Sequence, residues 1–117
     1  MATDLVGNVK LQEFISLLSD LNHQCVDAIK TGDLRTIERM NVTIEKMYAI
    51  QHVGTEDAYT AIEEDAQIIY KNMDGITTMI STCEKGKIDS ATNSAVKKFL
   101  HNIFDATVRI VIAYGLA

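Results

Sequence analysis

Residues 59–83 read YTAIEEDAQIIYKNMDGITTMISTC and contain the apolar pattern that decides the fold. Apolar residues recur at alternating spacings of 3 and 4 residues, at Tyr59, Ile62, Ala66, Ile69, Met73, Ile76, Ile80 and Cys83. This is the a/d stripe of a heptad repeat, which allows one long helix to pack lengthwise against others. The stretch therefore predicts a long helix within a helical bundle.

The composition of the whole chain is that of one helical domain. Its 117 residues are 47% hydrophobic and 23% charged, which is typical of a soluble globular protein. A chain of this length buries roughly two-thirds of its unfolded surface, enough for a core without metal or disulfide. Proline, which helices tolerate least in their interior, is absent. We therefore expect a single all-α domain over residues 1–117.

Glycines and capping residues divide the chain into four predicted helices. Thr31-Gly32-Asp33, Gly54-Thr55 and the segment 84–90 around Gly86 each combine a helix stop with a cap for the next helix. These breaks predict helices at about 6–31, 34–53, 56–84 and 90–115. Because short links favour antiparallel neighbours, we expect an up-down-up-down four-helix bundle.

The other three predicted helices carry apolar stripes of the same kind. They comprise Leu11, Phe14, Leu18, Leu21, Cys25 and Ala28 in the first helix, Ile37, Met40, Ile44 and Met47 in the second, and Val96, Phe99, Ile103, Ala106 and Ile110 in the fourth. Cys25 and Cys83 both fall on stripes. We expect two buried free thiols, with a disulfide between them as the alternative.

The charge of the chain bears on its partners and location. The net charge is −5, which argues against nucleic acid as the main partner. Residues 55–84 carry −6 and residues 85–117 carry +3, so the third and fourth helices should attract along their flanks. The N-terminus resembles no signal peptide, and the longest apolar run, residues 110–114, is too short to span a bilayer. We expect an acidic cytoplasmic protein without a transmembrane segment.

The sequence contains no recognisable catalytic motif, such as a glycine-rich phosphate loop. A bundle enzyme or metal or cofactor binder is the alternative, with polar residues near His23, His101 and Asp105, because bundles hold metals with inward-facing carboxylates and histidines. The heptad assignment opposes this, since His23 and His101 fall at the outermost position f and His52 at b. We therefore expect three solvated histidines, no metal and no cofactor.

A run of three acids, Glu63, Glu64 and Asp65, is the other candidate for acid–base chemistry. Glu63 and Glu64 map to positions e and f, which predicts a solvated face. Asp65 maps to g, beside the apolar stripe, and is the only one expected to be partly buried.

The last turns of the fourth predicted helix are apolar on nearly every side. Phe104, Val108, Val111 and Ile112 lie outside its stripe, at positions b, f, b and c, and Tyr114 follows them. A helix that is apolar all round is normally buried all round, within its own chain or against another. We expect these five residues to form an interface. A symmetric dimer is the simplest form, and another protein's helix is the alternative partner.

Residues 31–40, TGDLRTIERM, open the second predicted helix after a leucine-rich first helix. Over roughly residues 10–50, this pattern resembles the helical flagellar and type III export chaperones. The resemblance implies a small, acidic, cytoplasmic helical protein that holds an export substrate through an apolar helix surface, and it assigns no individual binding residue. The sequence thus favours a non-enzymatic, chaperone- or adaptor-like interaction protein, with a structural or viral assembly subunit as a further alternative.

Overall fold

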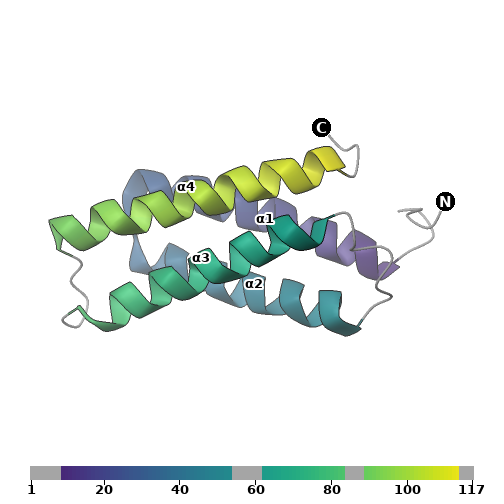
Figure 1. The fold of residues 1–117 in the computed structure, drawn as a ribbon, viewed down its shortest axis with the longest axis horizontal. Helices are drawn as coiled ribbons and strands as arrows, with labels where there is room; N and C mark the ends of the chain where they lie inside the picture. Colours follow the sequence, from purple (N-terminus) through teal and green to yellow (C-terminus); the bar gives the residue numbers. More distant parts are fainter. Residues whose placement is uncertain (1–8, 54–61, 84–88, 114–117) are drawn as a thin grey trace.

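A computed structural model describes residues 9–53, 62–83 and 89–113, with side chains from residue 12 to residue 50 in the first stretch (Figure 1). Four helices cover almost all of these residues: α1 (Val9–Thr31), α2 (Leu34–Val53), α3 (Glu63–Ser81) and α4 (Ser90–Ala113). The described stretches contain no β-strand, and no helix within them is both long and apolar enough to cross a membrane.

The helices form the predicted up-down-up-down four-helix bundle. The α1–α2, α3–α4 and α1–α4 pairs pack extensively, whereas α2 and α3 touch only slightly. Two polar pairs show that α3 and α4 are antiparallel. Asp65, near the start of α3, bonds Arg109 near the end of α4. Asn72, one heptad later in α3, bonds Asn102, one heptad earlier in α4. Tyr48 bridges the thin α2–α3 contact, with its ring edge-on to that of Tyr70 at a centroid distance of 5.1 Å.

The described turns between helices contain the predicted glycine helix stop and aspartate N-caps. Gly32 has a φ of +66° and its amide donates to the Ala28 carbonyl, which closes α1 in the left-handed conformation that glycine adopts without strain. Asp33 then caps α2 by accepting the amide of Arg35. Asp89 caps α4 in the same way, through the amide of Thr92 at 2.7 Å.

The predicted helix ends hold at Thr31, Leu34, Val53 and Ser90, but α3 ends at Ser81 and not at residue 84. The hydroxyls of Ser81 and Thr82 donate to the carbonyls of Thr78 and Met79, and the Thr82 amide bonds three residues back. These local bonds compete with the next helical turn and end it. α3 also begins later than predicted, at Glu63 with Ile62 as its N-cap, so the predicted helix from residue 56 does not continue as an α-helix through Ile62. The predicted ends at residues 6 and 115, and residue 56 itself, lie outside the described residues.

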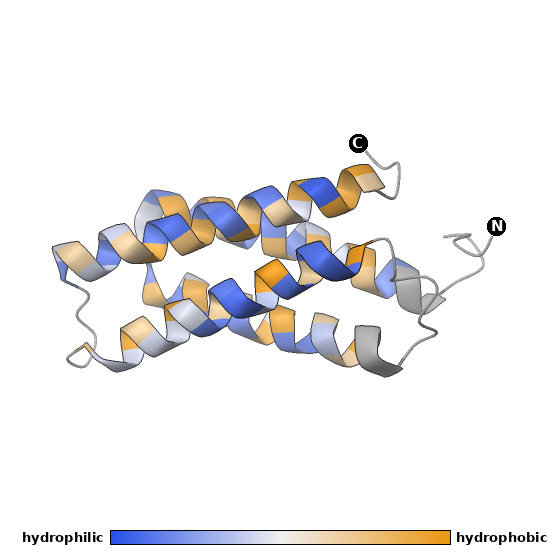
Figure 2. Ribbon diagram, in the orientation of Figure 1, coloured by the Kyte–Doolittle hydropathy of each residue, from blue (hydrophilic) through white to orange (hydrophobic). Residues whose placement is uncertain are grey.

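The core consists largely of the predicted stripes, and hydrophobic residues recur along each helix in Figure 2. The buried members are Phe14, Leu18, Leu21, Cys25, Ala28, Ile37, Met40, Ile44, Met47, Ile62, Ala66, Ile69, Met73, Ile76, Val96, Ile103, Ala106 and Ile110. Ile50 extends the second stripe, and Ile80 is only partly buried. The side chains of Leu11 and Tyr59 lie outside the described residues.

The buried face of α4 differs from the predicted stripe. Phe99 is only half-buried, whereas Leu100 and Thr107, which the stripe omitted, are almost fully buried. The reason is that α4 packs against both α1 and α3, so its buried face is wider than an a/d stripe. Leu100 and Thr107 share one side of α4, where the Leu100 carbonyl and the Thr107 hydroxyl bond residues of α1.

Phe99 packs on the other side of α4, against Gly75 of α3. A Cβ atom at Gly75 would lie 3.0 Å from two carbons of the Phe99 ring, closer than an ordinary contact. Glycine in a helix interior costs roughly 1 kcal/mol relative to alanine. Here it allows an aromatic ring to lie directly on the α3 backbone, which brings α3 and α4 close together.

Candidate protein-interaction surface

The outer side of α4 exposes two large apolar residues one helical turn apart. Val108 is 37% exposed and Ile112 is 59% exposed. Phe104 and Val111 border them but are partly buried and pack against the core. We call these four residues the α4 patch. Tyr114, the fifth residue of the predicted interface, lies outside the described residues.

The partial burial of Phe104 and Val111 corrects the prediction that both face away from the core. Both occupy heptad position b, which is adjacent on the helix to position e. The e residues Leu100 and Thr107 face α1, so the neighbouring b positions lie along the α1 flank. The bundle therefore covers part of the apolar surface that the sequence assigned to a partner, and the exposed part is narrower.

Among the described residues, the other two exposed large apolar side chains lie on α2. Val42 is 50% exposed and Tyr48 is 48% exposed. Tyr48 is already engaged with Tyr70 of α3. Within the described residues, α4 is thus the helix that exposes two large apolar residues on the same side, Val108 and Ile112, four residues apart.

An ion pair joins α3 and α4 beside the patch. The Arg109 Nε donates to the Asp65 Oδ1 at 2.7 Å, with side chains 48% and 22% exposed. This confirms that Asp65 is the partly buried member of the acidic run, whereas Glu63 and Glu64 are exposed. The Asp65–Arg109 ion pair is also one instance of the predicted attraction between the oppositely charged third and fourth helices.

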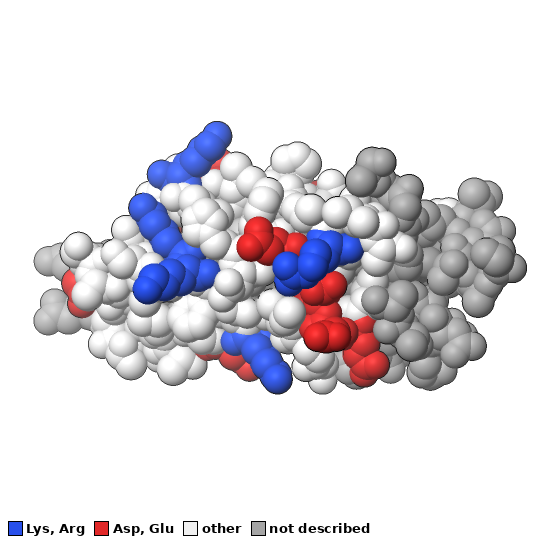
Figure 3. All heavy atoms as spheres, turned by 45° about the horizontal axis from the view of Figure 1, so that its top comes forward, with Lys and Arg blue, Asp and Glu red and all other residues white. Residues whose placement is uncertain are grey.

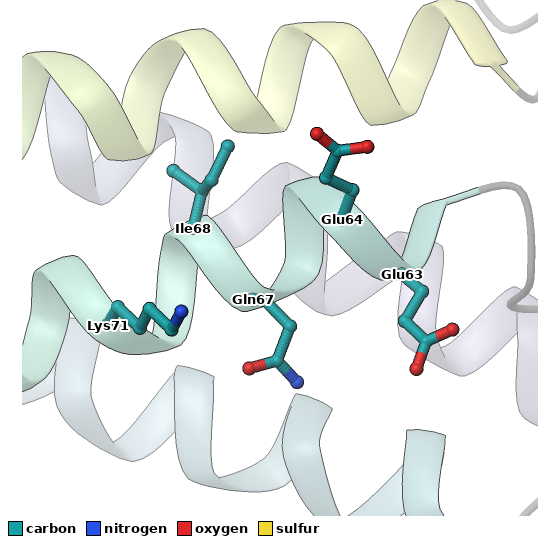
Figure 4. Close-up of a pocket in the computed structure, with 5 residues that line it drawn as sticks. All are labelled: Glu63, Glu64, Gln67, Ile68 and Lys71. Carbon is teal, nitrogen blue, oxygen red and sulfur yellow. The ribbon is translucent and has the colours of Figure 1, made fainter.

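The described pocket is a shallow depression on α3. Glu63, Glu64, Gln67, Ile68 and Lys71 line it, all from one helix. Figure 4 shows Glu64 and Ile68 projecting toward α4, whereas Glu63 and Gln67 project to the other side. An open depression on a single helix does not enclose a small substrate, but it continues the surface that borders α4.

Charge is unevenly distributed over this face of the bundle. In Figure 3, acidic side chains gather in the right-hand half and basic side chains mainly in the left-hand half. The first turn of α3 carries the acidic residues Glu63, Glu64 and Asp65, and Lys97 and Lys98 early in α4 are exposed.

The polar residues of the alternative metal or cofactor site all lie on the surface. His23, His101 and Asp105 are exposed, as their heptad positions predicted for the histidines. The Nδ1 atom of His23 lies 2.9 Å from the Ser19 carbonyl oxygen, within its own helix. Across the described stretches, no three His, Cys, Asp or Glu side chains are grouped so as to hold a metal ion. The His52 side chain lies outside those stretches.

Two buried threonines form hydrogen bonds with partly buried amide side chains of α1. The Asn22 amide of α1 donates to the Thr107 hydroxyl of α4 at 2.9 Å, and the Thr43 hydroxyl of α2 donates to Gln24 of α1 at 3.0 Å. Such pairs orient the helices relative to one another. Sequence reasoning missed both threonines because an apolar stripe does not include them.

The two cysteines are free, as predicted, but they differ in burial. Cys25 is fully buried and its thiol donates to the Leu100 carbonyl at 3.0 Å. Burial raises the pKa of Cys25 to about 12, and the negative charge of Asp105 adds to the rise while a backbone hydrogen bond at Phe104 opposes it. Cys83, which was expected to be buried, is only partly buried because it follows the end of α3.

Comparisons with known proteins add no family to this description. The chain matches no protein-family profile, no curated protein and no solved structure. What is established is an all-helical bundle with exposed apolar residues on α4.

Proposed function

We propose that this protein is a non-enzymatic, adaptor- or chaperone-like module that binds another protein through the α4 patch. The single observation that carries the proposal is the exposure of Val108 and Ile112 on one side of α4. The spacing of four residues places two apolar anchors on the same helix face, the arrangement by which helices recognise one another.

The position of the patch supports this function. Val108 and Ile112 belong to a helix whose other side is fixed in the core by Ile103 and Ile110. Because α4 is already folded, binding does not require the cost of ordering its backbone. Apolar area removed from water contributes roughly 25 cal/mol per Å², so covering the patch stabilises a complex.

The resemblance of residues 10–50 to export chaperones supports the chaperone-like version. Those proteins are small, acidic and helical, and they hold their substrate through an apolar helix surface. The same combination of acidic charge and an apolar outer helix face is present here.

Replacing Val108 with lysine is expected to abolish association without unfolding the protein. A lysine on the patch must be desolvated when a partner covers it, which costs several kcal/mol for an unpaired charge. We would compare wild-type protein, Val108→Lys and Val42→Lys, because Val42 is similarly exposed on α2 and receives the same charge. Self-association is measured by light scattering over a concentration series, and helix binding by fluorescence anisotropy with a labelled amphipathic leucine–lysine peptide of about 20 residues.

The proposal predicts that Val42→Lys associates like the wild type and that Val108→Lys does not, with equal thermal stability. Absence of any complex in both assays, or equal loss in the two variants, would contradict it.

A further inference from the structure

We infer that the partner of the α4 patch is a basic amphipathic helix, which packs apolar residues on Val108 and Ile112 and places lysine or arginine beside Glu64 and Asp105. This inference rests on the proposed function, because it names the chemistry of the partner at the same surface. The charges next to the patch carry it.

One acidic side chain borders the exposed apolar residues, and a second, on α3, projects toward α4. Asp105 is exposed and lies one turn before Val108, on the same side of α4 as Val108 and Ile112. Glu64 comes from α3, next to Asp65, whose carboxylate bonds Arg109 beside Val108. Figure 4 shows the Glu64 side chain projecting toward α4. The α4 patch therefore has one carboxylate on its own helix side, and a second carboxylate projects from α3 toward the same helix.

On the described parts of α3 and α4, the basic residues nearest the patch either pair with an acid or lie further along the helix. Arg109 is the nearest basic residue in sequence, and Asp65 already pairs with it at 2.7 Å. Lys71 lies seven residues after Glu64, and Lys98 lies seven residues before Asp105. Seven helical residues correspond to about 10 Å along the axis, close to one screening length in physiological salt. The local field at the patch thus favours a cationic partner.

A second copy of this chain fits the patch less well than a basic helix. A symmetric contact at the patch brings the acidic residues Asp105 and Glu64 of both copies into one interface, and each copy carries a net charge of −5, so the two copies repel. Stable dimers also bury roughly 800 Å² per partner. Here two of the four patch residues are partly covered by the bundle itself.

The test uses two fluorescent peptides of about 20 residues with the same leucine stripe, one with lysine and one with glutamate at the polar positions. Binding to the full chain is measured by anisotropy at low and at high salt. The protein variants are Glu64→Gln/Asp105→Asn at the patch and Glu38→Gln/Asp74→Asn as the matched control. Both variants remove one exposed glutamate and one exposed aspartate.

We expect the lysine peptide to bind the wild type at least tenfold more tightly than the glutamate peptide, and more weakly at high salt. The patch variant should lose roughly three- to tenfold of that affinity, because each exposed attraction contributes a few-fold. The control variant should stay within about twofold of the wild type. Equal binding of the two peptides, or equal loss in the two variants, overturns the inference.

A third variant, Ile112→Ser, separates this inference from the proposed function. If Ile112→Ser abolishes peptide binding while the charge variants change nothing, the patch binds helices without regard to charge and only the present inference fails. If Ile112→Ser binds the lysine peptide like the wild type, the apolar contact is absent and the proposed function fails with it. A dimer that Ile112→Ser dissociates, with no peptide binding, assigns the patch to a second copy and overturns the inference.

Discussion

Replacing Phe14 with alanine is expected to lower the free energy of unfolding by about 3–5 kcal/mol. Phe14 has no exposed surface and belongs to the core of α1, α2, α3 and α4 side chains. Truncation removes the transfer free energy of the ring and leaves a cavity that the surrounding helices fill only in part. Domains of this size are stable by about 5–15 kcal/mol, so the loss is a large fraction of the total.

Urea denaturation followed by circular dichroism measures this loss. Val42→Ala is the matched control, because Val42 is half-exposed on α2 and its truncation should change stability by less than about 0.5 kcal/mol. A loss below about 1 kcal/mol for Phe14→Ala would show that the ring is not packed as described. The shared stripe pattern of the four helices would then not converge on one core.

Alkylation of the native protein near pH 8 is expected to modify Cys83 and to leave Cys25 almost untouched, with rates that differ by about three orders of magnitude. The thiolate is the reactive species, and burial raises the pKa of Cys25 to about 12 while its thiol bonds the Leu100 carbonyl. Mass spectrometry after timed iodoacetamide treatment locates the label. Concentrated guanidinium chloride should make both cysteines react alike.

The raised pKa of Cys25 also predicts the sign of a pH effect. The unfolded chain releases this proton near pH 9, whereas the folded state keeps it to about pH 12. Between these values the folded state binds more protons, so the free energy of unfolding falls as pH rises. The fall should be smaller in Cys25→Ala. Fast labelling of native Cys25, or an unchanged slope in that variant, would contradict the described burial.

The sequence predicted the bundle well because its periodicity and its turn chemistry agree. Stripes on four segments require lengthwise packing, and Gly32, Asp33 and Asp89 end and start helices by local backbone bonds. Both signals are local, so neither depends on knowing the neighbours of a helix. The histidine positions followed from the same register, and His23 and His101 are indeed exposed.

The sequence predicted the candidate surface less well because that surface depends on which helices flank α4. A single-helix heptad assignment places Phe104 and Val111 outside the core, but α1 and α3 together cover a wider arc of α4. The same neighbours bury Leu100 and Thr107 and leave Phe99 on Gly75. No periodicity within α4 reveals these contacts, since residues of two other helices create them.

The most direct test of the central claim, that the outer side of α4 is a binding surface, is a chemical-shift map of the ¹⁵N-labelled protein titrated with the leucine–lysine peptide. The account predicts that the largest shifts fall on residues 104–112 of α4 and on residues 63–68 of α3, with α2 around Val42 unaffected. Largest shifts on α2, or a spectrum unchanged at saturating peptide, would contradict it.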